Sequence, residues 1–246
     1  MSLFIGDVEN MKILAMDSSG LVASVAIVTE DTILAEYTVN YKKTHSQTLL
    51  PMLNEIVKMV EINMEEVDAI AVAAGPGSFT GLRIGSATAK GLGLALNKPI
   101  IAVPTLDGLA YNLYGTDKLI CPLMDARRNQ VYTGLYEFVK GEFQIVKEQM
   151  AAAVEELLVE INAIGREVIF LGDGIAVYKE LIEEKIEVDF SFAPIHLNRQ
   201  RAGAIGALGI ELYRKNHFEK AAEHEPVYLR VSQAERERAE RINSAK

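Results

Sequence analysis

The sequence predicts an α/β protein made of two similar βββαβα units, each with a mixed sheet flanked by helices, and with the second unit degenerate. Short apolar runs rich in β-branched residues alternate along the chain with stretches of helical periodicity. A Met-Asp pair at the end of a first strand occurs twice, at Met16 and at Met124. The turn Gly75-Pro76-Gly77 is echoed by Gly172-Asp173-Gly174 roughly one hundred residues later, which indicates an internal repeat.

The first unit is expected over residues 11–117. KILAMDSSG, LVASVAIVT and DTILAEYTVN predict three strands, because Ser-Gly and Glu-Asp turn signals separate them. HSQTLLPMLNEIVKMVEI has apolar residues at helical spacing, with Pro51 either in a first turn capped by Thr48 or at a kink. The strand VDAIAVAA, a helix from about Thr80 to Leu96, the strand PIIAVP and a helix from about Thr105 to Tyr114 follow. Strands that alternate with helices predict parallel neighbours in a mixed sheet.

The second unit is expected over residues 118–230. KLICPLMDARR, QVYTGLYEF and EFQIVKEQM predict its three strands, followed by a helix near Ala151 to Ile161 and the strand EVIFLGDG. AGAIGALG predicts a close-packed helix near the end of the unit. Residues 1–10 are interpreted as a leader of uncertain role and residues 231–246 as a charged tail, more typical of a solvated helix or frayed end than of an RNA-binding arm.

The composition excludes several classes of protein. The chain of 246 residues is 49% hydrophobic, which is enough for a well-buried core. No apolar run is long enough for a membrane span and no signal peptide is evident, so a cytoplasmic protein is expected. The net charge of −9 argues against a protein that grips nucleic acid with a whole face. The single cysteine, Cys121, has apolar neighbours and is expected to be a buried structural thiol.

The glycine-rich stretch AAGPGSFTGLRIG does not match a nucleotide-binding motif. Gly75 and Gly81 bracket five residues and Leu82 follows where a Walker A lysine would stand. The stretch predicts a strand, a tight corner and a helix start whose free amides could hold an anion or a carboxylate. The alternative is a corner that only turns the chain. The residues of this candidate ligand loop are Asp17, Gly75, Gly77, Ser78, Thr80 and Arg83.

No catalytic residue and no metal site is predicted. Asp17 and Asp125 each end a first strand, where a carboxylate could be a catalytic or metal-linked acid or could simply cap the following turn. The four histidines are scattered, and none has a partner at a usual ligand spacing. Gly77-Ser78-Phe79-Thr80-Gly81 also lacks the spacing of a nucleophile elbow.

Two resemblances extend this interpretation. The repeated βββαβα unit resembles the architecture of the actin, hexokinase and acetate kinase superfamily, in which the turn between the first two strands of each half carries phosphate-facing groups. The chain also resembles the TsaB family of bacterial proteins, once catalogued with glycoproteases, over about Met11 to Arg230. The residues that carry this second resemblance are MKILAMDSS from Met11, THS at 44–46, LLP at 49–51, GPGSFTGLRIG at 75–85, MDARR from Met124 and PVYLR from Pro226.

The TsaB resemblance implies a part in making threonylcarbamoyladenosine at position 37 of tRNAs that read codons beginning with A. In that system the paralogue TsaD holds a metal through a His-x-x-x-His pair and transfers the threonylcarbamoyl group, while TsaB pairs with TsaD and the ATPase TsaE joins them. Leu49 stands here where the second histidine would follow His45. The resemblance therefore implies a non-catalytic scaffold or activator without cofactor, whose contact with tRNA is indirect.

A partner interface is expected on two helices of the first unit. The apolar stripe of the helix after Thr48 is too wide for one covered face, and the next helix carries small residues at four-residue intervals. The same surface could form a homodimer in isolation. The residues of this predicted interface are His45, Leu49, Leu50, Met52, Leu53, Ile56, Gly81, Gly85 and Ala89. The rival readings are a kinase, ATPase or peptidase acting on its own, and a vestigial cleft that binds ATP or ADP without catalysis.

Overall fold

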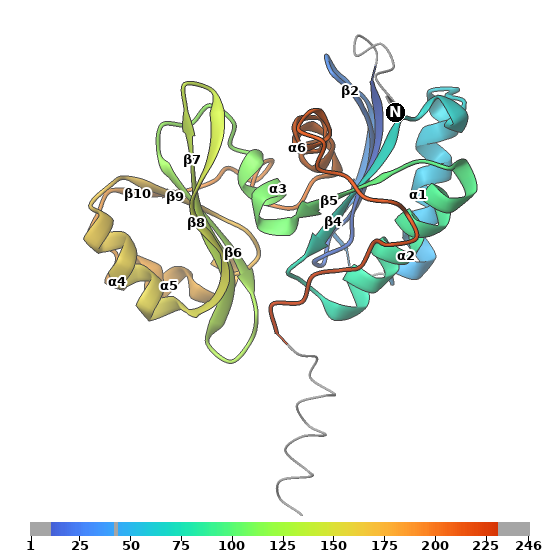
Figure 1. Cartoon of the computed structure of the whole chain (residues 1–246). Helices are drawn as coiled ribbons and strands as arrows, with labels where there is room; N and C mark the ends of the chain where they lie inside the picture. The colour runs from blue at the N-terminus through green and yellow to red at the C-terminus, as the bar shows by residue number, and fades with distance from the viewer. Residues whose placement is uncertain (1–10, 42–43, 231–246) are drawn as a thin grey trace, which may run out of the picture.

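The computed structural model describes residues 11–41 and 44–230, arranged as two five-stranded mixed sheets with helices on their faces (Figure 1). The predicted leader, residues 1–10, and the predicted tail, residues 231–246, lie outside the described residues. The first unit contains β1 (Lys12–Asp17), β2 (Ala23–Thr29), β3 (Ile33–Val39), α1 (His45–Met59), the short helix η2 (Met64–Glu66), β4 (Ala69–Gly75), α2 (Phe79–Leu96), β5 (Ile100–Pro104) and α3 (Thr105–Tyr111).

The second unit repeats the first. It contains β6 (Leu119–Asp125), β7 (Gln130–Val139), β8 (Glu142–Ala153), α4 (Val154–Ile164), β9 (Val168–Leu171), α5 (Ile175–Lys185), β10 (Phe190–Phe192) and α6 (Ala202–Arg214). The strand orders are β3-β2-β1-β4-β5 and β8-β7-β6-β9-β10, so equivalent strands take equivalent places. In both sheets the first strand runs antiparallel to the second and parallel to the fourth. The predicted fold class is confirmed.

Several predicted boundaries needed correction. Residues 151–153 pair with β7, so they extend β8 and helix α4 begins only at Val154. Helix α3 ends at Tyr111, three residues before the predicted end. Helix α1 begins at His45 with Thr44 as its N-cap residue, so Pro51 lies inside the helix and Thr48 is not the cap. Helix α5 and strand β10 were not predicted.

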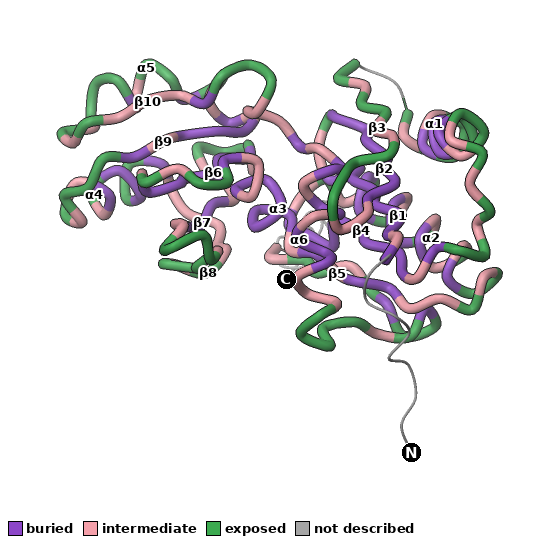
Figure 2. Tube along the Cα trace, turned by 90° about the horizontal axis from the view of Figure 1, so that it is seen from above, coloured by how far each residue is buried: buried purple, intermediate pink, exposed green. Residues whose placement is uncertain are grey.

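The last helix of each unit packs against the sheet of the other unit. Helix α6 covers β1 and β2 of the first sheet, where Gly206 lies against Val28 and Ala15. Helix α3 contributes Leu106 and Leu109 to a cluster with residues of the second sheet. Figure 1 shows α3 and α6 between the two sheets, and the burial colouring in Figure 2 shows buried backbone at the same place. The two units therefore share one continuous buried contact.

The chain after α6 returns along the first unit. Glu219 forms an isolated antiparallel bridge with Ile100 of β5, and the Val227 amide donates to the Ala74 carbonyl of β4 at 2.7 Å. Helix α6 and the segment after it thus pack against the first sheet and its helices, although they were expected to belong to the second unit. The expected boundary at residue 118 lies in the connection between α3 and β6.

Candidate functional site

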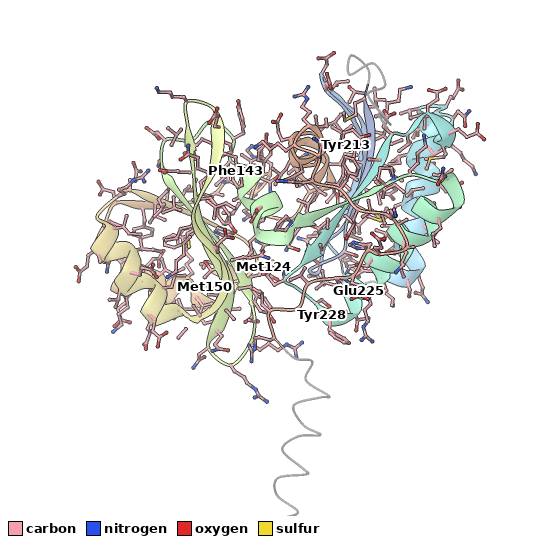
Figure 3. All side chains as sticks on the ribbon, in the orientation of Figure 1. Met124, Phe143, Met150, Tyr213, Glu225 and Tyr228 are labelled. Atoms are coloured by element: carbon pink, nitrogen blue, oxygen red, sulfur yellow. The ribbon has the colours of Figure 1, made fainter. Side chains whose placement is uncertain are left out.

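A cleft of about 630 Å³ lies between the two units. Its walls are the β1–β2 turn, the β4–α2 corner, the β6–β7 turn, Asp173 after β9, and the segment from Val227 to Arg230. Figure 3 labels Met124 of the second unit and Tyr228 of the C-terminal segment, which both line this cleft. The internal repeat therefore places equivalent turns from the two units on opposite sides of one cavity.

The two glycine corners share a positive φ at their first glycine. Gly75 ends β4 and Gly172 follows the equivalent strand β9, with φ of 126° and 109°, a region that only glycine enters easily. The Ser78 amide donates to the Ser19 carbonyl at 2.6 Å, and the Gly174 amide donates to the Leu123 carbonyl at 2.9 Å. Each corner is thus tied to the first strand or turn of its own unit, which explains the echo of the two sequences.

Helix α2 begins at the first corner. Ser78 is its N-cap residue, and its hydroxyl accepts from the Gly81 amide at 3.3 Å. Phe79 and Thr80 line the cleft. The guanidinium of Arg83 lies 4.0 Å from the centroid of the Phe79 ring, and its Nε donates to the Tyr228 hydroxyl at 3.3 Å. Among the residues that the structure describes, no carboxylate forms an ion pair with Arg83.

The glycines of α2 allow the helix to pack closely on the β1–β2 turn. A Cβ added to Gly81 would lie 2.0 Å from the Ser18 carbonyl oxygen, and a Cβ added to Gly85 would lie 2.5 Å from the Ser18 hydroxyl. That hydroxyl donates to the Gly81 carbonyl at 2.9 Å. Close packing on the chain's own backbone is therefore one function of these glycines.

Three carboxylates near the cleft hold the turns in place. Asp17 is buried beneath the lining and accepts from the amide and the hydroxyl of Ser19 at 2.8 and 2.6 Å. Asp125 accepts from the Arg127 amide at 2.8 Å, and Asp173 accepts from the Asp125 amide at 3.1 Å. Of the two alternatives for Asp17 and Asp125, the structure shows the turn-capping contacts.

Burial changes the acidity of two of these groups. Loss of water around the Asp17 carboxyl raises its pKa, although the two bonds from Ser19 oppose the rise. Burial also raises the pKa of Asp173, against the effects of the Asp125 amide and the nearby Arg199. A carboxyl with a raised pKa can hold a proton more easily than a free aspartate, but both groups already accept bonds from their own turns.

His45 lies at the cleft, whereas Leu49 lies in the core of the first unit. The Nε2 atom of His45 lies 2.8 Å from the Gly20 carbonyl, and the residue lines the cleft. Leu49 is 1% exposed and belongs to the core cluster between α1 and the first sheet. Within the described ranges, no three histidine, cysteine, aspartate or glutamate residues are grouped so that they could hold a metal ion.

Most residues of the predicted interface face inward. Leu49, Met52, Leu53 and Ile56 are the buried residues of α1. Figure 2 shows both buried and exposed colouring along this helix. The small residues proposed with them on α2 are also buried: Gly81, Gly85 and Ala89. Leu50 is the exception among the apolar side chains, with 52% of its surface exposed. A partner on these helices would therefore contact other side chains than most of those predicted.

The C-terminal segment contributes residues to the cleft that no single pattern in the sequence had placed there. Val227 through Arg230 line the cleft, and the Phe79 and Tyr228 rings lie 4.8 Å apart between centroids. The Nη1 atom of Arg230 donates to the Ala126 carbonyl at 3.0 Å, so the segment reaches from the first unit to the second. The motif PVYLR indicated the family resemblance of this segment but not its position in the fold.

A second buried polar group joins this segment to α2. His224 is 2% exposed, its Nδ1 lies 2.6 Å from a Glu219 carboxylate oxygen, and its Nε2 lies 3.0 Å from the Ser86 hydroxyl. The order hydroxyl, imidazole, carboxylate is that of a hydrolase triad. Ser86, however, is 5% exposed in the interior of α2, and none of the three residues lines the cleft. The group fastens the segment to the helix.

Comparisons with known proteins agree on one family. A family model described as TsaD, tRNA N6-adenosine threonylcarbamoyltransferase, matches residues 32–238. The tRNA threonylcarbamoyladenosine biosynthesis protein TsaB of Bacillus subtilis is 36% identical over 92% of this chain and 96% of its own length. The protein of the same name from Haemophilus influenzae is 30% identical over 90% of this chain and 94% of its own length.

A solved structure agrees with these relatives. A crystal structure from Pseudomonas aeruginosa, of a protein with similarity to the peptidase YeaZ, covers 89% of this chain and 100% of its own, with a TM-score of 0.77 and 28% identity. In the part of the chain that the structure describes, no helix is long and apolar enough to cross a membrane. The matches extend over nearly the whole chain, and the chain therefore belongs to the TsaB family.

Proposed function

We propose that this protein takes part in the biosynthesis of threonylcarbamoyladenosine in tRNA, in the cytoplasm, as a non-catalytic partner of TsaD. The names of its relatives and the match to the TsaD family model support a role in this modification. In the family, TsaD transfers the threonylcarbamoyl group and TsaE joins the pair. The role of this chain is then to hold TsaD in an active arrangement.

The observation that supports a non-catalytic role is that the polar groups at the cleft bond to the chain's own turns. A general acid or base must reach the reacting atoms through a free oxygen or nitrogen. Asp17, Asp125 and Asp173 each accept bonds from backbone amides of the surrounding turns, and His45 is bonded to the Gly20 carbonyl. These bonds hold the two corners in place, so one oxygen of each carboxylate and the Nε2 atom of His45 already have a structural use.

The exposed side of α2 is the surface on which we place TsaD. Ala87, Gly91 and Leu94 are exposed and follow one another at helical spacing, and a Cβ added to Gly91 would meet nothing within 4 Å. A stripe of small residues lets another helix approach closely, and Leu94 adds an apolar contact at 58% exposure. This stripe lies beside the buried row of Gly81, Gly85 and Ala89 on the same helix.

Substitution of Gly91 tests this placement. Gly91→Glu adds a charged side chain to the exposed stripe without a clash inside the chain, so the variant should fold and fail to co-elute with TsaD in size-exclusion chromatography. Gly91→Ala is the matched control and should co-elute like the unaltered protein. Normal co-elution of a folded Gly91→Glu variant would reject this surface. The same comparison of elution volumes without TsaD shows whether the stripe also forms a homodimer.

Reconstitution tests the function itself. TsaD, TsaE, tRNA, ATP and the threonylcarbamoyl adenylate precursors are combined with and without this protein, and modified nucleoside is measured by mass spectrometry. The proposal expects strong formation of the nucleoside only when the chain and TsaD are both present. Formation by this chain without TsaD would show an intrinsic activity and overturn the non-catalytic role. Equal formation by TsaD and TsaE without this chain would overturn the partner role.

Retained nucleotide binding is a second candidate function, because the cleft has the size of a typical ligand site. Phe79 and Thr80 at the start of α2 line it, and the N-terminus of a helix favours a bound anion. Binding of ATP or ADP here would be regulatory. Isothermal titration calorimetry of the isolated protein with each nucleotide measures it directly, and absence of heat with both would remove this candidate.

A further inference from the structure

The arginines of the described residues fall into two groups. Three arginines away from the cleft form ion pairs: Arg166 with Glu137, Arg201 with Glu36, and Arg214 with Glu30 and Glu211. Arg199 forms no ion pair within the described ranges and donates to the carbonyls of Gly172 and Asn198. Those at the rim of the cleft form no ion pair with any residue that the structure describes: Arg83, Arg127, Arg128 and Arg230. In a chain of net charge −9, four of the described guanidinium groups without an ion pair therefore lie at the rim of the cleft, where Arg230 bonds the Ala126 carbonyl.

Two aromatic rings lie among these arginines. Tyr228 is 39% exposed and packs on Phe79, while Arg83 stacks over the Phe79 ring and bonds the Tyr228 hydroxyl. Arg127 and Arg230 line the same cleft as both rings, and Arg128 follows Arg127 in the exposed β6–β7 turn. We call these six residues the rim patch. The carboxylates of Asp125 and Asp173 also line the cleft, so the positive charge belongs to the rim and not to the whole cavity.

We propose that the rim patch binds a single-stranded segment of RNA, with its arginines on phosphates and its aromatic rings on unstacked bases. Unpaired RNA loops are recognised by stacking on aromatic rings and guanidinium planes together with contacts to phosphates. An acidic peptide would use the arginines but would leave the exposed Tyr228 ring without a matching flat surface. The inference rests on the proposed function, because the modified adenosine lies in the anticodon loop of tRNA; it makes the contact with tRNA direct, where the sequence predicted an indirect one.

Fluorescence anisotropy of the full chain tests this binding. The probes are a labelled tRNA transcript with adenosine at position 37 and its isolated anticodon stem–loop, titrated between about 50 and 200 mM salt. Arg127→Ala combined with Arg128→Ala should weaken binding by about tenfold at low salt and lower the slope of log affinity against log salt by about 1.4, since each single-strand phosphate contact contributes about 0.7. Tyr228→Ala should weaken binding by about five- to a hundredfold, whereas Tyr228→Phe should keep most of it.

A matched control separates a specific patch from overall charge. Arg166→Ala combined with Arg214→Ala removes the same charge from surfaces away from the rim and should leave RNA binding unchanged. Equal losses in the two double variants, or no RNA binding by the unaltered protein with and without TsaD, would overturn the proposal. So would rim variants that bind RNA normally but no longer co-elute with TsaD or TsaE, because the patch would then be a protein contact.

The reconstituted modification reaction keeps this proposal distinct from the proposed function. If the unaltered chain stimulates formation of the nucleoside and the rim variants bind RNA and stimulate equally well, only the rim proposal fails. If the unaltered chain gives no stimulation, the proposed function fails whatever the binding of RNA.

Discussion

Two glycines of α2 should respond in opposite ways to the same substitution. In Gly91→Ala the added Cβ meets nothing within 4 Å, so the helix gains the propensity of alanine, about 0.5–1 kcal/mol. In Gly81→Ala the added Cβ would lie 2.0 Å from the Ser18 carbonyl oxygen, and real Cβ contacts are essentially never shorter than 3.0 Å. The start of α2 or the β1–β2 turn must therefore move by at least about 1 Å, a form of overpacking that costs roughly 1–3 kcal/mol.

Urea unfolding followed by far-ultraviolet circular dichroism measures both effects. The free energy of unfolding should rise for Gly91→Ala and fall for Gly81→Ala. In a thermal unfolding experiment, each kcal/mol should shift Tm by about 2–4 °C for a chain of this size. Because the displaced turn carries Ser19 and borders the cleft, Gly81→Ala should also lower activation of TsaD, while Gly91→Ala should not. A Gly81→Ala protein as stable as the unaltered chain would refute the close packing inferred for this helix.

Three further predictions follow from buried groups. Burial raises the pKa of Asp107 from 3.8 to about 6, so the folded chain holds that proton more tightly than the unfolded chain does. The free energy of unfolding should therefore fall by about 3 kcal/mol as pH rises from about 4 to about 6. The difference in urea midpoint between Asp107→Asn and the unaltered protein should change over the same pH range. His224→Ala should lower the free energy of unfolding by roughly 2–4 kcal/mol, because it leaves a cavity and removes the partner of Ser86; unchanged urea midpoints would contradict the anchoring role. Burial raises the pKa of Cys121 to about 12, so the thiol should resist a disulfide reagent until the chain unfolds; rapid labelling of native protein would count against its burial.

Much of the fold could be predicted from local patterns. Strand β4 is apolar at every position and β1 is apolar from Ile13 to Met16, because helices cover both faces of the sheet, and this gives a clear signal. Helix α5 was missed since only Tyr178 and Ile182 are buried along it, too few to show helical periodicity. Strand β10 has three half-buried residues and gives almost no pattern. Residues 151–153 favour a helix by composition, yet pairing with β7 holds them in a strand.

The candidate site was predictable in part. The glycine corner and the Ser78 cap follow from local backbone requirements, and the structure has both. The wide apolar stripe of α1 suggested a second partner, but Leu49, Met52, Leu53 and Ile56 all lie in the core of this chain. The width of an apolar stripe on a helix does not determine how much of that helix the sheet of the same chain covers.

The sequence alone determined the α/β class, the duplicated unit and the family, because hydrophobic periodicity, turn residues and a specific motif are local properties of the chain. Only the tertiary structure decided which side chains meet at the cleft. Arg230 reaches the Ala126 carbonyl across 104 positions of sequence, and Tyr228 reaches Arg83 across 145. Such contacts depend on the exchange of helices between the two sheets and on the return of the C-terminal segment, which global packing selects and no short pattern specifies.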